Sequence, residues 1–304
     1  MVRLALMAQT AVESQILESA SAFSPVTLRA LSRARLSEDA LRRISPVAAL
    51  LRERPEATLG EAFDAAHRAL TAVYRTEYVY KNELISRIVF GRHSPRTASA
   101  VLELRMGDSC ADVVILNGTS TVYEIKTDLD QFSRLEGQLW DYSSRAEHVN
   151  VVVSEGRASV ACDRSPKHVG ILALRKNGSI STIREAESNI ERMHSDHLFG
   201  MLRVGEAHAT LKQLCEWDAP PDQVQAWYEA RELFSSLDTS VAHAELVHHL
   251  RQRGSASNSL VVNGRFPVSL RALAYAEEFS QVGMVRIQER LCMEASLFVG
   301  VDKH

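Results

Sequence analysis

The sequence predicts an α/β fold in which a mixed sheet flanked by helices lies between two helical regions. Alternation of apolar residues with a period of two, typical of strands, begins near residue 98 and recurs to about residue 185. One helical pattern, at 131–145, interrupts it, which is the order expected for a mixed sheet. Before and after this stretch, apolar residues recur at helical spacing. We therefore expect a helical N-terminal region (1–75), an α/β core (76–185) and a mainly helical C-terminal lobe (186–304).

Composition indicates a soluble globular protein. The chain has 304 residues, 45% of them hydrophobic and 24% charged, with a net charge of −3. This charge argues against a passive coat for nucleic acid but is compatible with an enzyme that has a local basic groove. There is neither an apolar run that could span a membrane nor a signal peptide in Met1–Thr10, so we expect a cytoplasmic protein. The four cysteines contain no CxxC pair, which argues against a structural zinc site and a disulfide framework.

Helix-start signals are frequent before residue 80. They are Ser24-Pro25, Ser37 before Glu38-Asp39, Ser45-Pro46, and the capping-box pattern Thr58-Leu59-Gly60-Glu61. A further helix is predicted over Tyr78–Phe90, with Glu83 at the edge of its apolar stripe and Gly91 as its end.

The predicted core then continues as strands. They are Val101–Arg105, a hairpin from Ser109 to Lys126, then, after the helix at Gln131–Arg145, Val149–Val153 and the pair Val169–Leu174 and Ser179–Ile183 around Asn177-Gly178. The C-terminal lobe reads as the helices Phe199–Leu202, Leu211–Trp217, Gln223–Leu237, Val241–Arg251 and Leu270–Phe279, with the apolar triplet Leu260–Val262 between the last two. We expect a recognition or oligomerisation role for this lobe, and a DNA-reading winged helix is one option.

The hairpin carries three charged residues in apolar strands: Asp112, Glu124 and Lys126. A buried charge is costly unless it is paired or binds a metal. Glu124 and Lys126 share a face because strand side chains alternate. If Leu116 pairs with Ser120 across a three-residue loop, Asp112 lies opposite Glu124, whereas a two-residue turn would separate them. We predict the three-residue loop, or a bulge with the same effect.

Opposed carboxylates repel unless a cation lies between them. Oxygen ligands without cysteine or histidine select Mg²⁺ or Mn²⁺. Lys126, on the same face as Glu124, can then act on a water molecule and on the charge of a phosphorane. The alternative for these residues is a salt-bridged surface hairpin.

The wider arrangement resembles a known superfamily. A helix carries Glu83, a second strand carries Asp112, a third carries Glu124-Ile125-Lys126, and the next helix carries Gln138 and Tyr142. This resembles the PD-(D/E)XK nuclease superfamily, and the Gln-x-x-x-Tyr helix is similar to the motif of its RecB-like branch. The resemblance covers about residues 76–185, and Tyr78–Ile183 is similar to a group of largely uncharacterised bacterial proteins. Ala111 stands where the motif has proline, a position that varies and binds no metal.

The resemblance implies a restriction-endonuclease-like core and a Mg²⁺- or Mn²⁺-dependent deoxyribonuclease, with DNA favoured over RNA. Asp112, Glu124 and the Ile125 carbonyl would bind the metal, and Glu83 would complete its shell directly or through water. Lys126 would act on the water nucleophile and the scissile phosphate. Gln138 and Tyr142, one turn apart, would position the substrate or Lys126; ordinary helix packing is their alternative. In prokaryotes such cores occur in restriction, repair, mobile elements and phage defence.

Partners follow from charge. Between Lys81 and Arg105, five basic residues outnumber two acidic ones. Three arginines of this stretch, Arg87, Arg92 and Arg96, are candidates for binding phosphates together with Arg134, which lies further along the chain. A solvated surface is the alternative. We expect Asp128 and Asp130 to form a turn and a helix cap. We expect helical surface or core roles, rather than a metal site, for the histidines at 194, 197, 243, 248 and 249, and burial for the tryptophans.

Two other functions stay open. A nuclease-like fold can serve as a non-catalytic nucleic-acid-binding or partner-assembly module. The site can also belong to a regulated effector that is silent until a partner or ligand acts on the helical regions, through which a homo-oligomer or a partner protein would bind.

Overall fold

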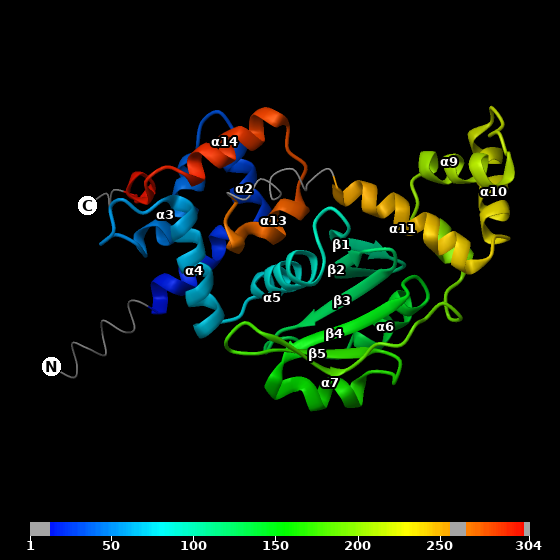
Figure 1. The fold of residues 1–304 in the computed structure, drawn as a ribbon, viewed down its shortest axis with the longest axis horizontal. Coiled ribbons are helices and arrows are strands. Elements are labelled where there is room, and N and C mark those ends of the chain that lie inside the picture. The colour runs from blue at the N-terminus through cyan, green and yellow to red at the C-terminus, as the bar shows by residue number, and fades with distance from the viewer. Residues whose placement is uncertain (1–12, 256–265, 301–304) are drawn as a thin grey trace. The chain divides into compact units, whose positions relative to one another are not determined.

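The computed structural model describes residues 13–255 and 266–300 (Figure 1). The expectations for Met1–Thr10 and for Leu260–Val262 therefore lie outside the described residues. Contacts divide the chain into two compact units. The first unit comprises residues 1–91, 176–179 and 256–304, and the second comprises 92–175 and 180–255. Residues 76–91, which the motifs assign to the predicted core, belong to the first unit; the motif-based division stays a prediction.

The first unit is helical in its described part. Residues 13–19 form a helix, followed by η1 (Ala20–Ala22), α2 (Pro25–Ser32), α3 (Glu38–Ala49), α4 (Leu59–Val73), α5 (Glu77–Leu84), the π-helix η2 (Ile85–Arg92), η5 (Val268–Leu270), α13 (Arg271–Ala276), α14 (Gln281–Leu291) and η6 (Ala295–Phe298). The helix α14 was not predicted from the sequence.

Most of the helix starts agree with the capping signals. The Ser37 hydroxyl accepts a hydrogen bond from the Ala40 amide, and Thr58 and Glu61 form the predicted capping box. The expected start at Ser45-Pro46 is wrong because Pro46 lies inside α3. Its buried residues Ala40, Ile44, Val47 and Ala48 recur at helical spacing, and this core-facing stripe carries the helix through the proline.

The predicted helix at 78–90 changes its winding midway. α5 ends at Leu84, and the chain continues as a π-helix to Arg92, so the prediction that Gly91 ends the helix is wrong. The wider π turn keeps Ile85, Ile88 and Val89 buried together.

Segments from the two ends of the chain hold the first unit together. The Arg290 guanidinium donates to the Leu31 carbonyl (2.6 Å), and the Leu59 amide donates to the Met293 carbonyl (2.8 Å). The Tyr78 hydroxyl donates to the Ser269 carbonyl over 2.6 Å. The predicted N-terminal region therefore shares one helical unit with the last part of the predicted C-terminal lobe, whereas residues 186–255 of that lobe belong to the second unit.

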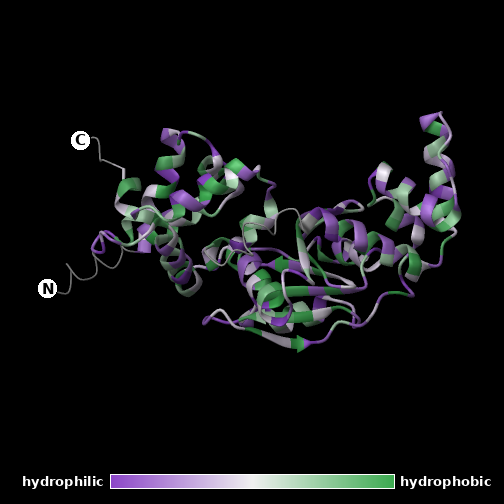
Figure 2. Ribbon diagram, turned by 45° about the horizontal axis from the view of Figure 1, so that its top comes forward, coloured by the Kyte–Doolittle hydropathy of each residue, from purple (hydrophilic) through white to green (hydrophobic). Residues whose placement is uncertain are grey.

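The second unit contains the mixed sheet with its helices, as the sequence predicts. The strands, in sheet order, are β1 (Ser99–Met106), β2 (Ser109–Leu116), β3 (Ser120–Lys126), β4 (His148–Ser154), β5 (Gly170–Leu174) and β6 (Ile180–Arg184). β3, β4 and β5 are parallel, and the other neighbours are antiparallel. β5 is buried at every residue and β4 at all but its first, and Figure 2 shows hydrophobic residues along the strands.

Seven helices complete the described part of the second unit. They are α6 (Leu135–Ser143), η3 (Glu155–Arg157), α7 (Ala158–Arg164), α8 (Ser195–Phe199), α9 (Val204–Cys215), α10 (Gln223–Ser235) and α11 (Thr239–Ser255). The helix predicted at 199–202 lies instead just before that stretch, in α8. No described helix is long and apolar enough to span a membrane.

The β2–β3 register confirms the three-residue loop. Leu116 pairs with Ser120, and the ladder continues to Val113 and Tyr123. Asn117, Gly118 and Thr119 form the loop between the strands, which rules out the two-residue turn.

Two glycines allow a matched test of the sheet's tight connections. Both Gly107 (φ +67°) and Gly118 (φ +94°) adopt the left-handed conformation. A Cβ at Gly107 would lie 2.2 Å from the Asp141 carboxylate oxygen on α6, whereas nothing lies within 4 Å of a Cβ at Gly118. We expect Gly118→Ala to lower the free energy of unfolding by about 1–2 kcal/mol, and Gly107→Ala by roughly 1–3 kcal/mol more. Urea unfolding of both variants measures the difference, and equal losses would contradict the close packing of Gly107 on α6.

Candidate active site

Three neighbouring elements of the second unit bring the candidate residues together. β2 carries Asp112, β3 carries Glu124 and Lys126, and α6 carries Gln138 and Tyr142. α6 packs on one face of the sheet through Leu135 and Leu139, which belong to the same hydrophobic core as Val114 of β2 and Val122 of β3. Its two polar residues are four apart, so they face the sheet together.

Glu124 is the centre of a buried hydrogen-bond network. Its side chain is 2% exposed, and one oxygen, Oε1, accepts from Lys126 Nζ (2.7 Å) and Gln138 Nε2 (2.6 Å). The other oxygen, Oε2, accepts from the Tyr142 hydroxyl (2.9 Å). Lys126 Nζ also donates to Gln138 Oε1 over 2.8 Å. The carboxylate and the ammonium are therefore both paired and hydrogen-bonded, the condition under which buried charges are tolerated.

The pKa of the Tyr142 hydroxyl lies well above its ordinary value. Burial is the main cause, and the negative charges of Glu124 and Asp112 add to it, while a hydrogen bond with Gln138 acts in the opposite direction. The hydroxyl therefore stays protonated at neutral pH and remains a donor to Glu124.

The side chain of Asp112 forms a hydrogen bond to β3, the strand that carries Glu124. Its Oδ2 accepts a hydrogen bond from the Ile125 amide (2.7 Å). The β2–β3 register, extended by one residue, sets Asp112 opposite Glu124, but the ladder itself ends at Val113 and Tyr123. Asp112 thus lies opposite Glu124 in the register, as predicted, and its carboxylate bonds to the main chain of β3.

These oxygens are of the chemical type that a hard divalent cation prefers. Two carboxylates and the Ile125 carbonyl are ligands of the type that Mg²⁺ and Mn²⁺ prefer. Glu124 accepts three hydrogen bonds, and a carboxylate has about four acceptor positions, so one remains on Oε2. Over residues 13–255 and 266–300, no three His, Cys, Asp or Glu residues gather as a metal site. Water and substrate phosphate would fill the remaining positions, as is usual for Mg²⁺.

Glu83 belongs to the first unit. Its Oε2 accepts from Arg87 Nε (2.9 Å), and His67 Nδ1 lies 4.0 Å from its Oε1. Burial raises the pKa of Glu83, although the charge of Arg87 acts against that rise. The predicted share of Glu83 in the metal shell stays a prediction.

The predicted phosphate-binding arginines have different surroundings. Arg87 is paired with Glu83, and Arg134 occupies the N-cap position of α6 without a side-chain cap bond. The exposed Arg96 accepts a hydrogen bond from Arg251 through its main-chain carbonyl, and the positive charge of Arg92 acts on the Tyr123 hydroxyl. Their contact with substrate stays a prediction.

Arg157, which is not among the residues predicted for the site, holds the loop between Lys126 and α6. Its guanidinium donates to the carbonyls of Thr127 and of Asp130 (2.7 Å) and lies 4.5 Å from the ring centroid of Phe132. A signal was present, because Arg157 follows β4, which is parallel to β3, so both strands end at one edge of the sheet.

The expected helix cap at Asp128 or Asp130 is wrong. Asp130 Oδ2 accepts from the Thr127 amide and hydroxyl (2.7 and 2.6 Å), and Asp128 accepts from the Ser154 hydroxyl. α6 starts only at Leu135 because both carboxylates close the loop instead.

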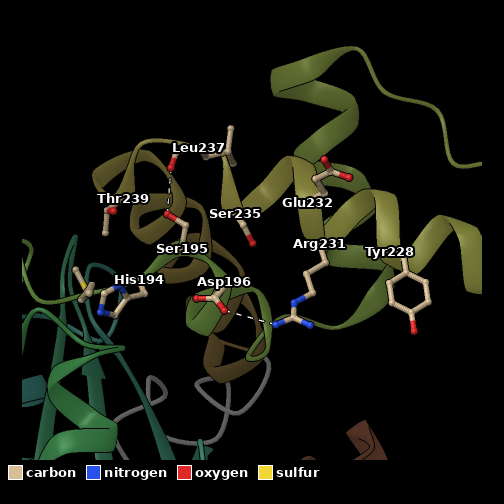
Figure 3. Close-up of a pocket in the computed structure, with 10 residues that line it drawn as sticks. His194, Ser195, Asp196, Tyr228, Arg231, Glu232, Ser235, Leu237 and Thr239 are labelled. Atoms are coloured by element: carbon tan, nitrogen blue, oxygen red, sulfur yellow. Dashed lines mark hydrogen bonds and ion pairs between the residues drawn. The ribbon is translucent and has the colours of Figure 1, made fainter.

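A hollow of the second unit lies away from the strands of the candidate site. It has a volume of about 690 Å³ and lies between α8 and α10, with the Arg231–Asp196 ion pair (3.5 Å) across it (Figure 3). Ser195 donates to the Leu237 carbonyl beside it (Figure 3). Nearby, the expectation that the tryptophans are buried is wrong for Trp140, which is 64% exposed, and for Trp227, which is 40% exposed.

The Tyr142 hydroxyl can be tested against a matched residue. We expect Tyr142→Phe to lower the free energy of unfolding by roughly 1.5–3 kcal/mol, because a buried carboxylate loses a donor. Tyr228→Phe, at a site that is 63% exposed, should change it by less than about 0.5 kcal/mol. Chemical unfolding at neutral pH measures both, and equal effects would contradict the network.

The Tyr142 effect should depend on alkaline pH. An unfolded tyrosine releases its proton near pH 10, whereas the folded Tyr142 holds it to higher pH. The folded state therefore binds more protons above pH 10, and stability falls there as pH rises. The difference between wild type and Tyr142→Phe should be constant below pH 10 and shrink above it.

Comparison with known proteins places the chain in a family. The family model described as Bacteriophage P4 protein cII matches residues 71–274, which is more than half of the chain and includes every candidate catalytic residue. Protein cII of Enterobacteria phage P4 is 36% identical over 69 residues, which cover 23% of this chain and 26% of that protein. The match thus spans about a quarter of the relative's length. No solved structure matches the chain. The extent of the family match shows that the chain belongs to the family of bacteriophage P4 protein cII.

Proposed function

We propose that this protein is a metal-dependent nuclease that hydrolyses phosphodiester bonds of DNA. The observation that carries the proposal is the buried network of Glu124, Lys126, Gln138 and Tyr142 beside Asp112. The motif that suggested a nuclease spreads these residues over three elements of the chain. Their contacts join into one connected group with an ammonium and two carboxylates, the groups that phosphodiester hydrolysis needs.

Each residue has a role that follows from its position. Asp112, Glu124 and the Ile125 carbonyl would hold Mg²⁺ or Mn²⁺. The bound metal polarises the phosphate and lowers the pKa of water. Lys126, 2.7 Å from Glu124, would move a proton at the attacking water and offset negative charge on the phosphorane. Gln138 contacts both Glu124 and Lys126, so it fixes the angle between them.

The setting we propose is the bacterial cytoplasm. DNA is favoured over RNA because the motif resembles that of DNA-processing nucleases. The family member named above is encoded by a phage. This fits a role in the interaction of phage or other foreign DNA with the bacterial host, such as defence against that DNA. Glu83 and the arginines at 87, 92, 96 and 134 would complete the metal shell and bind the phosphate backbone.

Substitution at the site tests the enzyme directly. We expect Asp112→Asn, Glu124→Gln and Lys126→Ala each to reduce DNA cleavage with Mg²⁺ or Mn²⁺ by roughly 100-fold or more, because each removes a metal ligand or the charge at the reacting water. Single- and double-stranded DNA and RNA should be assayed side by side.

Asp163→Asn and Lys167→Ala serve as matched controls, since both residues are exposed in the same unit. They should cut like the wild type. Circular dichroism verifies that every variant is folded. A wild-type protein that cuts none of the four substrates, or a Glu124→Gln variant that cuts normally, would overturn the proposal.

The rival function is a non-catalytic nucleic-acid-binding or partner-assembly module. The observation that favours it is that the two buried charges are already paired. Lys126 donates to Glu124 and to Gln138, and Tyr142 donates to Glu124, so the stability of the fold alone also explains their burial.

Metal titration separates the two functions. If the site is catalytic, Mn²⁺ should bind the wild type with a stoichiometry of about one, followed by electron paramagnetic resonance or calorimetry. Asp112→Asn and Glu124→Gln should each weaken binding by roughly tenfold or more, and Asp163→Asn should leave it unchanged. The absence of wild-type Mn²⁺ binding favours the non-catalytic module.

A further inference from the structure

The loop between β3 and α6, residues 127–134, carries an exposed leucine beside the candidate site. Leu129 is 74% exposed, the highest value among the large hydrophobic side chains of the described residues. It stands three positions after Lys126, the last residue of β3. Single exposed hydrophobic residues are common on protein surfaces, so exposure alone assigns no role to Leu129. The contacts of the surrounding loop are what distinguish it.

Hydrogen bonds hold both neighbours of Leu129. The Asp128 carboxylate accepts from the hydroxyl of Ser154, the last residue of β4. Asp130 Oδ2 accepts from the Thr127 amide (2.7 Å) and from the Thr127 hydroxyl (2.6 Å). Both carboxylates are thus engaged within the second unit, and the apolar side chain between them faces solvent.

Arg157 holds the same loop from the segment after β4. Its guanidinium donates to the carbonyls of Thr127 and of Asp130 (2.7 Å) and lies 4.5 Å from the ring centroid of Phe132. Because no residue from 127 to 134 is buried, polar contacts contribute more than core packing to the conformation of the loop. The positive charge of Arg157 also offsets the negative charge of the two aspartates, which reduces the repulsion that a phosphate group would meet here.

The loop lies at the edge of the sheet where the strand of the candidate site ends. β3 and β4 are parallel, so Lys126 and the segments that follow both strands share one edge. The Cα atoms of residues 126 and 129 are at most about 11 Å apart, since consecutive Cα atoms are separated by about 3.8 Å. Successive bases of a DNA strand are about 3.4 Å apart. A substrate whose scissile phosphate lies at Lys126 therefore has bases within reach of Leu129.

The chemistry of Leu129 favours double-stranded over single-stranded DNA. Proteins that bind single strands stack the bases on aromatic rings, whereas aliphatic side chains, leucine among them, enter as wedges between the base pairs of a duplex. A loop that is already ordered also loses little conformational entropy when it binds. Given the proposed nuclease function, on which this inference rests, we propose that Leu129 is a substrate-binding residue that packs against a base step of double-stranded DNA, within about three steps of the scissile phosphate.

The methyl groups of Leu129 report this contact in the full-length protein without cleavage. Leucine and valine methyl groups are labelled with ¹³C, and Ca²⁺ replaces Mg²⁺ so that the carboxylate oxygens still have a cation. Gel electrophoresis verifies that the DNA stays intact, and the Leu129→Ala spectrum assigns the resonances. A short duplex should shift the Leu129 methyl resonances through the ring currents of its bases, and each separated strand should shift them less. Val224, 67% exposed on α10 of the same unit, should not respond.

Affinity gives an independent measure. Leu129→Ala should bind the duplex roughly tenfold more weakly by fluorescence anisotropy, because the contact loses most of its apolar area. Leu129→Met should restore most of the affinity, since methionine also serves as a wedge. Val224→Ala, the matched control, should bind like the wild type. Thermal unfolding verifies that each variant is folded, as expected for substitutions at exposed positions. With Mg²⁺, Leu129→Ala should lower kcat/KM for duplex cleavage by roughly the same factor.

Three outcomes overturn the inference: a bound duplex that leaves the Leu129 methyl resonances in place, a Leu129→Ala variant that binds the duplex like the wild type, or equal shifts with duplex and with separated strands. A surface for a partner protein would give the first of these. Failure of the proposed function gives a different result. If the wild type cleaves DNA but Leu129→Ala cleaves equally well, the inference falls and the nuclease stands. If the duplex shifts Leu129 but is never cleaved, the nuclease falls and the DNA contact stands.

Discussion

The hydrogen bonds onto the buried carboxylate of Glu124 fix the arrangement of the second unit around the candidate site. An ionised carboxylate at 2% exposure is tolerated only if its oxygens are satisfied, and here they are satisfied from two elements. Lys126 supplies a donor from the same strand, and Gln138 and Tyr142 supply donors from α6. The helix is therefore held on the sheet by polar contacts at one end of the interface and by apolar packing of Leu135 and Leu139 along it. Displacing α6 would expose the apolar surface and also remove two of the three hydrogen bonds that the buried carboxylate of Glu124 accepts.

The sequence predicted well those features that depend on local patterns. Alternation located the strands, side-chain chemistry located the caps at Ser37 and Thr58, and the predicted three-residue loop gave the β2–β3 register that the structure confirms. The face shared by Glu124 and Lys126 followed from the same period of two. The predicted group from Asp112 to Tyr142 comes together because each member lies on a regular element whose orientation the pattern determines.

Features that depend on tertiary contacts were not predictable in this way. Pro46 looks like a helix start, yet a buried stripe on both sides of it continues the helix. Gly91 looks like a helix end, yet a π turn passes through it. Arg157, more than twenty residues beyond the start of α6, bonds to the loop before that helix, and no local signal near α6 reveals this contact. The left-handed backbone at Glu103 (φ +51°) is equally hidden, since glutamate is an ordinary strand-surface residue.

The assembly of the first unit from both ends of the chain has a consequence for synthesis on the ribosome. Helices α2 to α5 are made before the second unit, but their partners α13 and α14 are made after its whole sheet. The helix α2 therefore lacks its contacts with α14 until α14 has been made, and by then every residue of the second unit is already available. Domains fold as units during synthesis, so the sheet and its polar network can form while the helical unit still waits for its last segment. The order of completion is thus the reverse of the order in which the two units begin.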